Sequence, residues 1–383
     1  MTQAQEELSA LSRRILADKV TPQRLAEREA AGDRFDQVAW SALADAGILS
    51  AALPESAGGA GYGLAEQCSI LTELGRAVAP IPYLSSIVLG AAAIAEFGTD
   101  AQIARWAAPA GAGELILTAA LAEPDTDDLR CPSTKAERAA GKWRLTGTKT
   151  TVPAAARADL LLVPATTESG VAVFGVEQSD PGVTIRPQRL VDGDGAAEVD
   201  LAGVELPDDR LLGHDRATGL DQATGDSQAR GAGPDVAGWL TARATVGLCA
   251  LQLGVAERAL ELTAEYARQR TQFGRPIGAF QAVAQRLADA SIDVAGIRLT
   301  MWQAAWRLAA GLPCDTEIAT AKFWAADAGH RVAHTAVHIH GGVGIDTDYP
   351  LHRYFTAAKE NEFALGGATA QLRRLGAALA RND

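Results

Sequence analysis

The spacing of apolar residues changes twice along this chain of 383 residues, and this limits the folds open to it. Helical spacing up to about residue 118 gives way to short apolar runs bounded by Gly, Pro and Asp, which predict strands of a compact sheet or barrel. Long helical stripes return after residue 235. We therefore expect an N-terminal helical domain at 1–118, a middle β domain at 119–215 and a C-terminal helical bundle domain at 236–383.

Individual elements follow from the same patterns. Strands are expected at Trp143–Gly147, Leu160–Val163, Val171–Val176 and Val183–Ile185. A long helix should end near Gln272, before Gly274, and further helices are expected over 280–310, 315–340 and 350–381. Residues 216–235 are poor in apolar side chains and rich in Gly, Asp, Ala and Gln, which predicts a mobile linker.

Composition excludes several functions. The net charge of −12 argues against nucleic acid or an acidic membrane as a partner, because both select basic surfaces. The cysteines form no CxxC pair, which suits reduced thiols and argues against a zinc site or a disulfide framework; they are Cys68, Cys131, Cys249 and Cys314. No apolar run approaches the roughly 18 residues that span a bilayer. We therefore expect a cytoplasmic protein.

The most informative motif is the run Arg270-Thr271-Gln272-Phe273-Gly274-Arg275-Pro276-Ile277, followed by Phe280-Gln281. It resembles the Tyr-x-x-x-Arg-x-x-Phe-Gly signature of acyl-CoA dehydrogenases. Weaker marks of that family occur in the family's order: Leu53-Pro54-Glu55, Glu73-Leu74-Gly75-Arg76, Glu123-Pro124, Leu145-Thr146-Gly147-Thr148-Lys149, His340-Gly341-Gly342-Val343-Gly344 and Tyr349-Pro350. Together these marks cover most of the chain.

This resemblance implies an α+β, mainly α fold, with an N-terminal helical domain, a middle β-barrel and a C-terminal four-helix bundle that builds a dimer of dimers. It also implies a reaction, the α,β-dehydrogenation of an acyl-CoA thioester. In the family, a carboxylate removes the α-proton and the β-hydrogen leaves as hydride to FAD. Electrons usually pass on to an electron-transfer flavoprotein.

The carboxylate that serves the family as base is missing. Aligning Thr369 and Gln371 with the family's C-terminal motif places Gly367 at the position of the usual Glu. Some members carry the base on the helix before the Arg signature, and that position falls on Ala244. Neither residue can accept a proton, so we expect no catalytic residue in this chain. Glu362 is the nearest candidate for a displaced base, although an exposed helix charge is the favoured interpretation.

The residues that hold the flavin ring in the family are also altered. Asp125-Thr126-Asp127-Asp128 replaces a Gly- and Ser-rich run, and its charges disfavour phosphate. Thr151 replaces the Trp that covers the ring, and Pro153 replaces a residue with a hydrogen-bonding hydroxyl. The resemblance therefore implies that this chain does not hold a flavin ring by itself.

The part that one subunit lends to its neighbour's FAD is retained. The matching positions are Arg270, Phe273, Gln281, His338, Gly341 and Gly342. An Arg can bridge pyrophosphate oxygens, and paired glycines let the backbone approach a cofactor. The pattern resembles heterotetrameric acyl-CoA dehydrogenases of actinobacteria that act on steroid side chains. It implies the base-lacking subunit of an α2β2 complex, with FAD shared at the interface with a catalytic paralogue.

Other interpretations stay open. Arg270 can be a helix C-terminal charge favoured by the dipole, and the glycine pair can be a turn. The chain can be an active homotetrameric dehydrogenase with Glu362 as base, or a scaffold that binds neither FAD nor CoA. His330, His334 and His338 recur at helical spacing, but this pattern is common on polar faces and we expect no metal site.

Overall fold

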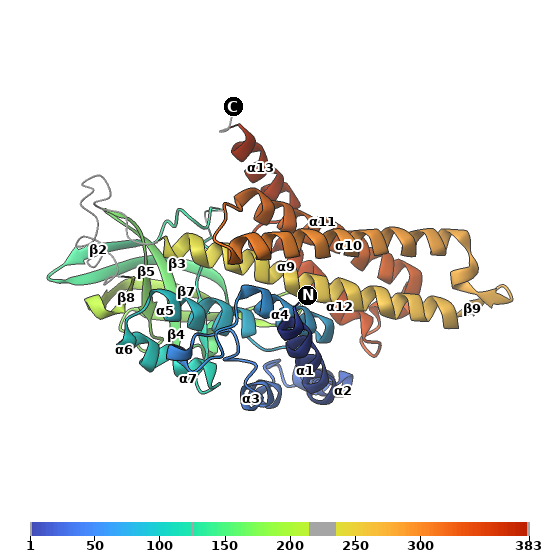
Figure 1. The fold of residues 1–383 in the computed structure, drawn as a ribbon, viewed down its shortest axis with the longest axis horizontal. Coiled ribbons are helices and arrows are strands. Elements are labelled where there is room, and N and C mark those ends of the chain that lie inside the picture. The colour runs from blue at the N-terminus through green and yellow to red at the C-terminus, as the bar shows by residue number, and fades with distance from the viewer. Residues whose placement is uncertain (1, 125, 127, 214–234, 381–383) are drawn as a thin grey trace.

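The computed structural model describes residues 2–124, 126, 128–213 and 235–380 (Figure 1). Helices from both ends of the chain pack beside a curled sheet, which confirms the predicted order of helices, strands and helices. The predicted linker over 216–235 lies outside the described residues, except for Asp235. This aspartate caps helix α9 (Val236–Gln269), and its carboxylate accepts a hydrogen bond from the Gly238 amide at 2.7 Å.

The N-terminal part is helical, as predicted. Its α-helices are α1 (Gln3–Lys19), α2 (Pro22–Ala30), α3 (Gln37–Asp45), α4 (Leu64–Ala77), α5 (Ala92–Phe97), α6 (Asp100–Gln102) and α7 (Ala108–Gly111), with π-helical turns at Tyr83–Ala91 and Ile103–Ala107. The glycine-rich break before α4 is a close approach of backbones. A Cβ at Gly59 would lie 2.0 Å from the Leu53 carbonyl oxygen, so only glycine fits there.

The strands form a mixed sheet that wraps round a core of its own. They are β1 (Leu117–Ala119), β2 (Lys135–Ala139), β3 (Lys142–Pro153), β4 (Leu160–Thr167), β5 (Gly170–Val176), β6 (Val183–Arg189), β7 (Gly195–Leu206) and β8 (Leu211–Leu212). Their order is β6-β7-β3-β2-β4-β5-β8, and β1 pairs with β4. Among the described residues β6 and β8 do not pair, so the predicted barrel is an open one.

The C-terminal helices are α9, α10 (Gln281–Ala309), α11 (Asp315–His340), α12 (Leu351–Phe363) and α13 (Ala368–Leu379). The prediction of one helix over 350–381 was wrong. Leu365 and Gly366 have φ angles of 60° and 93°, which no continuous right-handed helix contains. The prediction for the end of α9 was also too long, because residues 271–276 form a small hairpin of β9 (Thr271–Gln272) and β10 (Arg275–Pro276).

Glycines bring the N-terminal helices onto the bundle. A Cβ at Gly254 on α9 would lie 1.9 Å from the Thr72 carbonyl oxygen on α4, and one at Gly75 would lie 2.1 Å from the Leu251 carbonyl oxygen. Beside this contact Arg76 donates to Glu257 at 2.8 Å and to Glu261 at 2.7 Å. Helix α4 therefore packs closely against the middle of α9, while the hairpin after α9 lies at the far end of that helix (Figure 1).

Helix α9 corrects the prediction about membrane-spanning segments. By length and composition it could cross a membrane, since its most apolar 18-residue window has a mean hydropathy of 1.2. However, 83% of that window is buried within the protein. The apolar character of α9 therefore reflects its place at the centre of the bundle.

Candidate functional site

The hairpin at the end of α9 carries the first group of predicted site residues. Phe273 and Gly274 form its two-residue turn with φ angles of 52° and 77°, the combination that a tight type I′ turn needs. The Phe273 ring is 92% exposed, and its aromatic neighbour among the described residues is Phe280, edge-on at a centroid distance of 6.2 Å. A large apolar ring is thus held outward on a backbone conformation that residues other than glycine rarely adopt.

Arg270 sits at the base of this hairpin, and its amide donates to the Tyr266 carbonyl oxygen at 2.8 Å. Its side chain is exposed, and within the described part of the chain its guanidinium has neither a hydrogen bond nor an ion pair. Other arginines nearby are engaged, as Arg275 is over Phe280 at 4.3 Å. Gln281 begins α10 and is also exposed. Arg270 and Gln281 thus present donors to the outside.

The second group lies at the end of α11. His338 is exposed, and Gly341 follows the helix with φ 65° and ψ −140°, a conformation that favours glycine. A Cβ at Gly341 or Gly342 would meet no atom within 4 Å, so this backbone borders open space. The adjacent His340 ring stacks on Tyr266, one turn before Arg270, with centroids 4.3 Å apart. The fold therefore brings the ends of α9 and α11 together.

Gly367, at the position of the missing base, is the N-cap of α13. A Cβ there would contact only the Glu362 carbonyl oxygen at 3.5 Å and the Phe363 ring at 3.8 Å, so a larger residue would fit. Gln371 is buried and donates to the Gly366 carbonyl oxygen at 2.9 Å, while Thr369 is exposed. Gln371 therefore holds the loop in shape. Ala244, the other base position, is buried in α9.

Glu362 is not the exposed helix charge that the sequence favoured, since its side chain is only 14% exposed, and its contacts make it a poor base. Its carboxylate lies 2.6 Å from Lys359 Nζ and 3.0 Å from His330 Nδ1. Burial raises the pKa of Glu362, but the hydrogen bonds from Lys359 and His330 outweigh it and hold that pKa below the usual value. A general base near neutral pH needs a raised pKa and a free oxygen, and Glu362 has neither.

We expect Glu362→Gln to leave the kcat of an active complex containing this chain within about twofold. A catalytic base contributes roughly 10²- to 10⁴-fold to the rate, so the two outcomes are far apart. Dye-coupled acyl-CoA oxidation measures the effect, with Glu360→Gln on the same helix as the matched variant. A hundredfold loss specific to Glu362→Gln, with FAD content unchanged, would make Glu362 the base.

The altered flavin-ring residues lie on β3 and its neighbours. Thr151 has φ 47° and is exposed, and its amide donates to Gln188 Oε1 at 2.9 Å. The Pro153 carbonyl oxygen accepts the Thr118 hydroxyl at 2.7 Å. Of the acidic run, Asp125 and Asp127 lie outside the described residues. Thr151 therefore supplies no aromatic ring at the position where the family has Trp.

Two retained marks of the family have a structural role. Lys149 Nζ lies 2.6 Å from Glu123 Oε1, and both side chains are almost fully buried. Glu123 also accepts hydrogen bonds from the backbone amides and hydroxyls of Ser133 and Thr134. Burial raises the pKa of Glu123, but these donors, with Lys149 foremost, bring it to about 2. The Glu-Pro and Thr-Lys marks therefore report the sheet core and not a flavin contact.

The turn between β6 and β7 contacts both the N-terminal part of the chain and helix α12. The Val191 amide lies 3.4 Å from Glu360 Oε2 on α12. Arg34, between α2 and α3, donates to the Asp192 carbonyl oxygen and lies 3.0 Å from the Asp194 carboxylate. Burial, together with the nearby Asp192, raises the pKa of Glu360. The sheet is thus fastened to the helix that precedes the Gly367 loop.

The histidines of α11 do not assemble a metal site. His330 and His334 lie with ring centroids 4.2 Å apart, and His330 faces Glu362 and Lys359. His338 is exposed one turn further on. Within the described ranges, no three His, Cys, Asp or Glu side chains converge in a way that could hold a metal ion.

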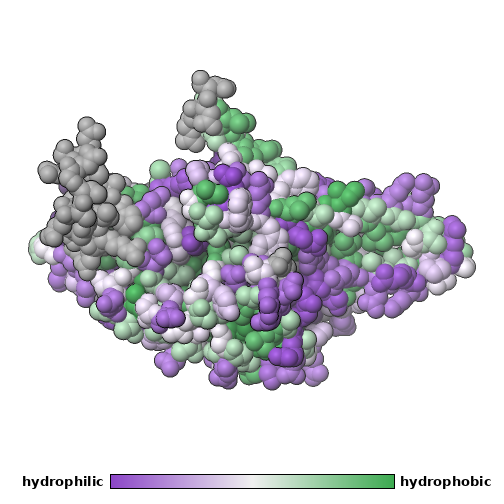
Figure 2. All heavy atoms as spheres, viewed as in Figure 1, coloured by the Kyte–Doolittle hydropathy of each residue, from purple (hydrophilic) through white to green (hydrophobic). Residues whose placement is uncertain are grey.

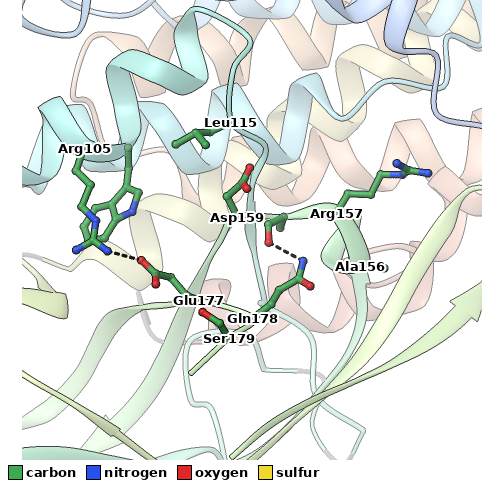
Figure 3. A pocket seen from close by; sticks show the side chains of 10 residues that line it. Arg105, Leu115, Ala156, Arg157, Asp159, Glu177, Gln178 and Ser179 are labelled. Atoms are coloured by element: carbon green, nitrogen blue, oxygen red, sulfur yellow. Dashed lines mark hydrogen bonds and ion pairs between the residues drawn. The ribbon is translucent and has the colours of Figure 1, made fainter. Parts of the chain in front are cut away.

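A surface cavity of about 500 Å³ lies elsewhere, between the N-terminal helices and the sheet (Figure 3). Its polar side chains are already engaged. Arg105 binds Glu177 at 2.6 Å, and Gln178 donates to the Ala155 and Ala158 carbonyl oxygens at 2.9 and 2.7 Å. The cavity therefore lies at the packing interface between the N-terminal helices and the sheet, and it is separate from the candidate site.

Comparison with known proteins identifies the family. Profiles described as the N-terminal, middle and C-terminal domains of acyl-CoA dehydrogenases match residues 2–114, 118–205 and 231–380. The chain belongs to the acyl-CoA dehydrogenase family. Members of this family use FAD. The predicted resemblance and fold are thereby confirmed.

Individual relatives agree with this assignment. "Acyl-CoA dehydrogenase FadE27" of Mycobacterium tuberculosis is 48% identical over 387 residues, covering 99% of this chain and 98% of the relative. A chain of the ChsE4–ChsE5 complex from the same organism is 48% identical with a TM-score of 0.90, covering 99% and 98%. A variant of the Tcur3481–Tcur3483 steroid acyl-CoA dehydrogenase is 39% identical with a TM-score of 0.90 and the same coverage. This chain is therefore similar to subunits of complexes, one of them described as a steroid acyl-CoA dehydrogenase.

Proposed function

We propose that this chain is the subunit of an α2β2 acyl-CoA dehydrogenase that lacks the base and completes the FAD site of a catalytic paralogue. The observation that carries the proposal is the contrast between two parts of the chain. Gly367 and Ala244 occupy both family positions for the base, whereas Arg270 is exposed and has no partner among the described residues. A chain with its own active site would need a carboxylate at a base position as well as the arginine that contacts FAD.

The residues at the far end of the bundle fit half of an FAD site. The Arg270 guanidinium is free to bind pyrophosphate oxygens, and the Gly341–Gly342 backbone borders open space that a cofactor can approach. Phe273 on the hairpin is 92% exposed, which leaves its ring open to contact by a neighbouring subunit. When bound, FAD supplies the hydride acceptor for the β-hydrogen of the acyl group. The α-proton passes to a carboxylate of the partner subunit, since this chain offers none at either base position.

Two relatives support a partner and a substrate class for this proposal. ChsE4–ChsE5 is a complex, and Tcur3481–Tcur3483 is named a steroid acyl-CoA dehydrogenase. By analogy we assign this chain a catalytic acyl-CoA dehydrogenase paralogue as partner and a ring-containing acyl-CoA as substrate. An electron-transfer flavoprotein is the proposed acceptor, and the cytoplasm the proposed location. The engaged carboxylate of Glu362 argues against an active homotetramer.

Flavin absorbance per chain tests the proposal, with the chain expressed alone and with a paralogue encoded beside it. We expect no bound flavin in the lone chain and about one FAD per two chains in the mixed complex. Native mass spectrometry of the same samples gives the subunit count. One FAD per chain in a self-assembled tetramer would contradict the split site.

We expect Gly367→Glu alone to give no measurable turnover in the separately expressed chain. The new side chain has room, because its Cβ would meet nothing closer than 3.5 Å. A base restores only roughly 10²- to 10⁴-fold in rate, however, and Thr151 and Pro153 still stand where the family holds the ring. Dye reduction with straight-chain and ring-containing acyl-CoAs measures this, and circular dichroism confirms folding. Appreciable turnover would show that the ring site survives.

A further inference from the structure

A cluster of three ring-bearing side chains, Tyr266, His340 and Tyr349, connects the Arg270 hairpin with the Gly341–Gly342 backbone. The His340 ring stacks on Tyr266 at an interplanar angle of 23°, with centroids 4.3 Å apart. Tyr349, in the connection between α11 and α12, approaches the same imidazole at 5.3 Å. These residues come from α9, the last turn of α11 and the segment before α12. One cluster therefore ties three elements at the far end of the bundle.

The hydrogen bonds of His340 fix its tautomer. Nδ1 lies 2.8 Å from the Ala336 carbonyl oxygen, which can only accept, so Nδ1 carries the proton. Nε2 is then an acceptor, and the Tyr349 hydroxyl donates to it at 3.2 Å. Burial lowers the pKa of His340 and raises that of Tyr349, which keeps both groups neutral near neutral pH. The imidazole is thus held in one orientation from both sides.

Two members of the cluster, His340 and Tyr266, lie close in sequence to residues of the candidate FAD half-site. His340 immediately precedes Gly341, whose backbone borders open space. Tyr266 precedes Arg270 by one helical turn, and its carbonyl oxygen accepts the Arg270 amide at 2.8 Å. A rotation of the imidazole or a loss of the stack would therefore shift Gly341 and Arg270 relative to one another.

We propose that Tyr266, His340 and Tyr349 are positioning residues that set the geometry between Arg270 and the Gly341–Gly342 backbone for the partner's FAD. This inference rests on the proposed function, because it assumes that these two groups meet one cofactor. The cluster itself does not touch the cofactor. It fixes the end of α9 relative to the end of α11. The Arg270 side chain itself makes no bond within the described residues, so it does not contribute to this arrangement. Pre-organised donors bind more tightly than mobile ones.

The test is the rate of FAD release from the mixed complex, followed by flavin fluorescence after dilution. Tyr349→Phe removes only the hydroxyl, and His340→Phe keeps a ring but removes both hydrogen bonds. We expect release to be about three- to tenfold faster for Tyr349→Phe and faster still for His340→Phe, since one ordinary hydrogen bond supplies about this factor. His340→Gln, which keeps an acceptor for Tyr349, should lie between His340→Phe and the wild type.

Tyr354→Phe is the matched control. Tyr354 lies on α12, and the variant loses the hydroxyl's hydrogen bond to the Arg76 carbonyl oxygen at 2.8 Å and its interaction with Arg258, neither of which involves Arg270 or Gly341–Gly342. It should lower the melting temperature as Tyr349→Phe does and leave FAD release unchanged. Equal release rates for Tyr349→Phe, His340→Phe and Tyr354→Phe would overturn the positioning role.

Arg270→Ala separates failure of this inference from failure of the proposed function. If Arg270→Ala releases FAD faster and the cluster variants do not, the half-site stands and only the positioning role is wrong. If Arg270→Ala leaves FAD release unchanged, the half-site itself is wrong. Should His340→Phe not assemble, Tyr349→Phe against Tyr354→Phe still decides the inference.

Discussion

Replacing Arg270 with alanine in the mixed complex should weaken FAD binding about 10- to 150-fold. The guanidinium is exposed at the base of the hairpin and has no partner in the described residues, so the wild-type chain gives up no internal bond when it binds an anion. One charge-assisted hydrogen bond is worth about 1.5–3 kcal/mol, which corresponds to that range. FAD retained after dialysis and a titration of the stripped complex both measure the loss. If Arg270 only interacted with the helix dipole, its removal would weaken FAD binding far less.

Arg268→Ala supplies the control for that explanation. Arg268 lies in the last turn of α9 and is also exposed, so its removal costs the same favourable interaction with the helix dipole. The dipole is worth roughly 0.3–1 kcal/mol at an exposed site. Equal FAD affinities for Arg268→Ala and Arg270→Ala would reduce Arg270 to a helix-end charge. A loss confined to Arg270→Ala supports the cofactor contact.

The fold could be predicted well wherever the apolar period was strong. Helix α11 was predicted with the bounds that the structure has, because both its ends carry clear signals, Asp315 at the start and Gly341 at the end. Strand β7 (Gly195–Leu206) was missed because alanine, glycine and acidic residues are poor strand formers, although apolar and acidic residues alternate from Ala197 to Leu201. The break at Leu365 was missed for another reason. Its left-handed backbone is imposed by the loop that Gln371 holds, and no local propensity of leucine indicates it.

The candidate site, too, could be predicted only in part. The absence of a base is evident from the sequence, because neither Gly367 nor Ala244 has a side chain that can accept a proton, whatever its surroundings. The state of a carboxylate that is present depends on its partners. His330 and Lys359 lie on two helices, and only the fold shows that both converge on Glu362. The Tyr266–His340 stack joins residues 74 positions apart; both stand within marks of the family, but their contact was not predictable from either.

Replacing Lys149 with methionine should destabilise the protein by about 3–5 kcal/mol, the usual cost of leaving one charge of a buried ion pair unpaired. Lys149 and Glu123 are almost fully buried and 2.6 Å apart, so no water can take the place of the ammonium. Chemical unfolding of the mixed complex measures the effect. The double variant Glu123→Gln/Lys149→Met should recover much of the loss, because it leaves no buried charge. A single variant as stable as the wild type would show that the pair is open to water.

The same pair predicts how stability depends on pH. The pKa of Glu123 is about 2 in the folded protein and near 4.5 in the unfolded chain, so the unfolded state binds its proton first on acidification. The contribution of Glu123 is therefore complete above about pH 4.5 and is lost as the pH falls from there towards 2. Without Lys149 the folded pKa of Glu123 rises, and this acid-sensitive window narrows. In the double variant this part of the pH dependence should disappear, which separates the ion pair from all other carboxylates that titrate over the same range.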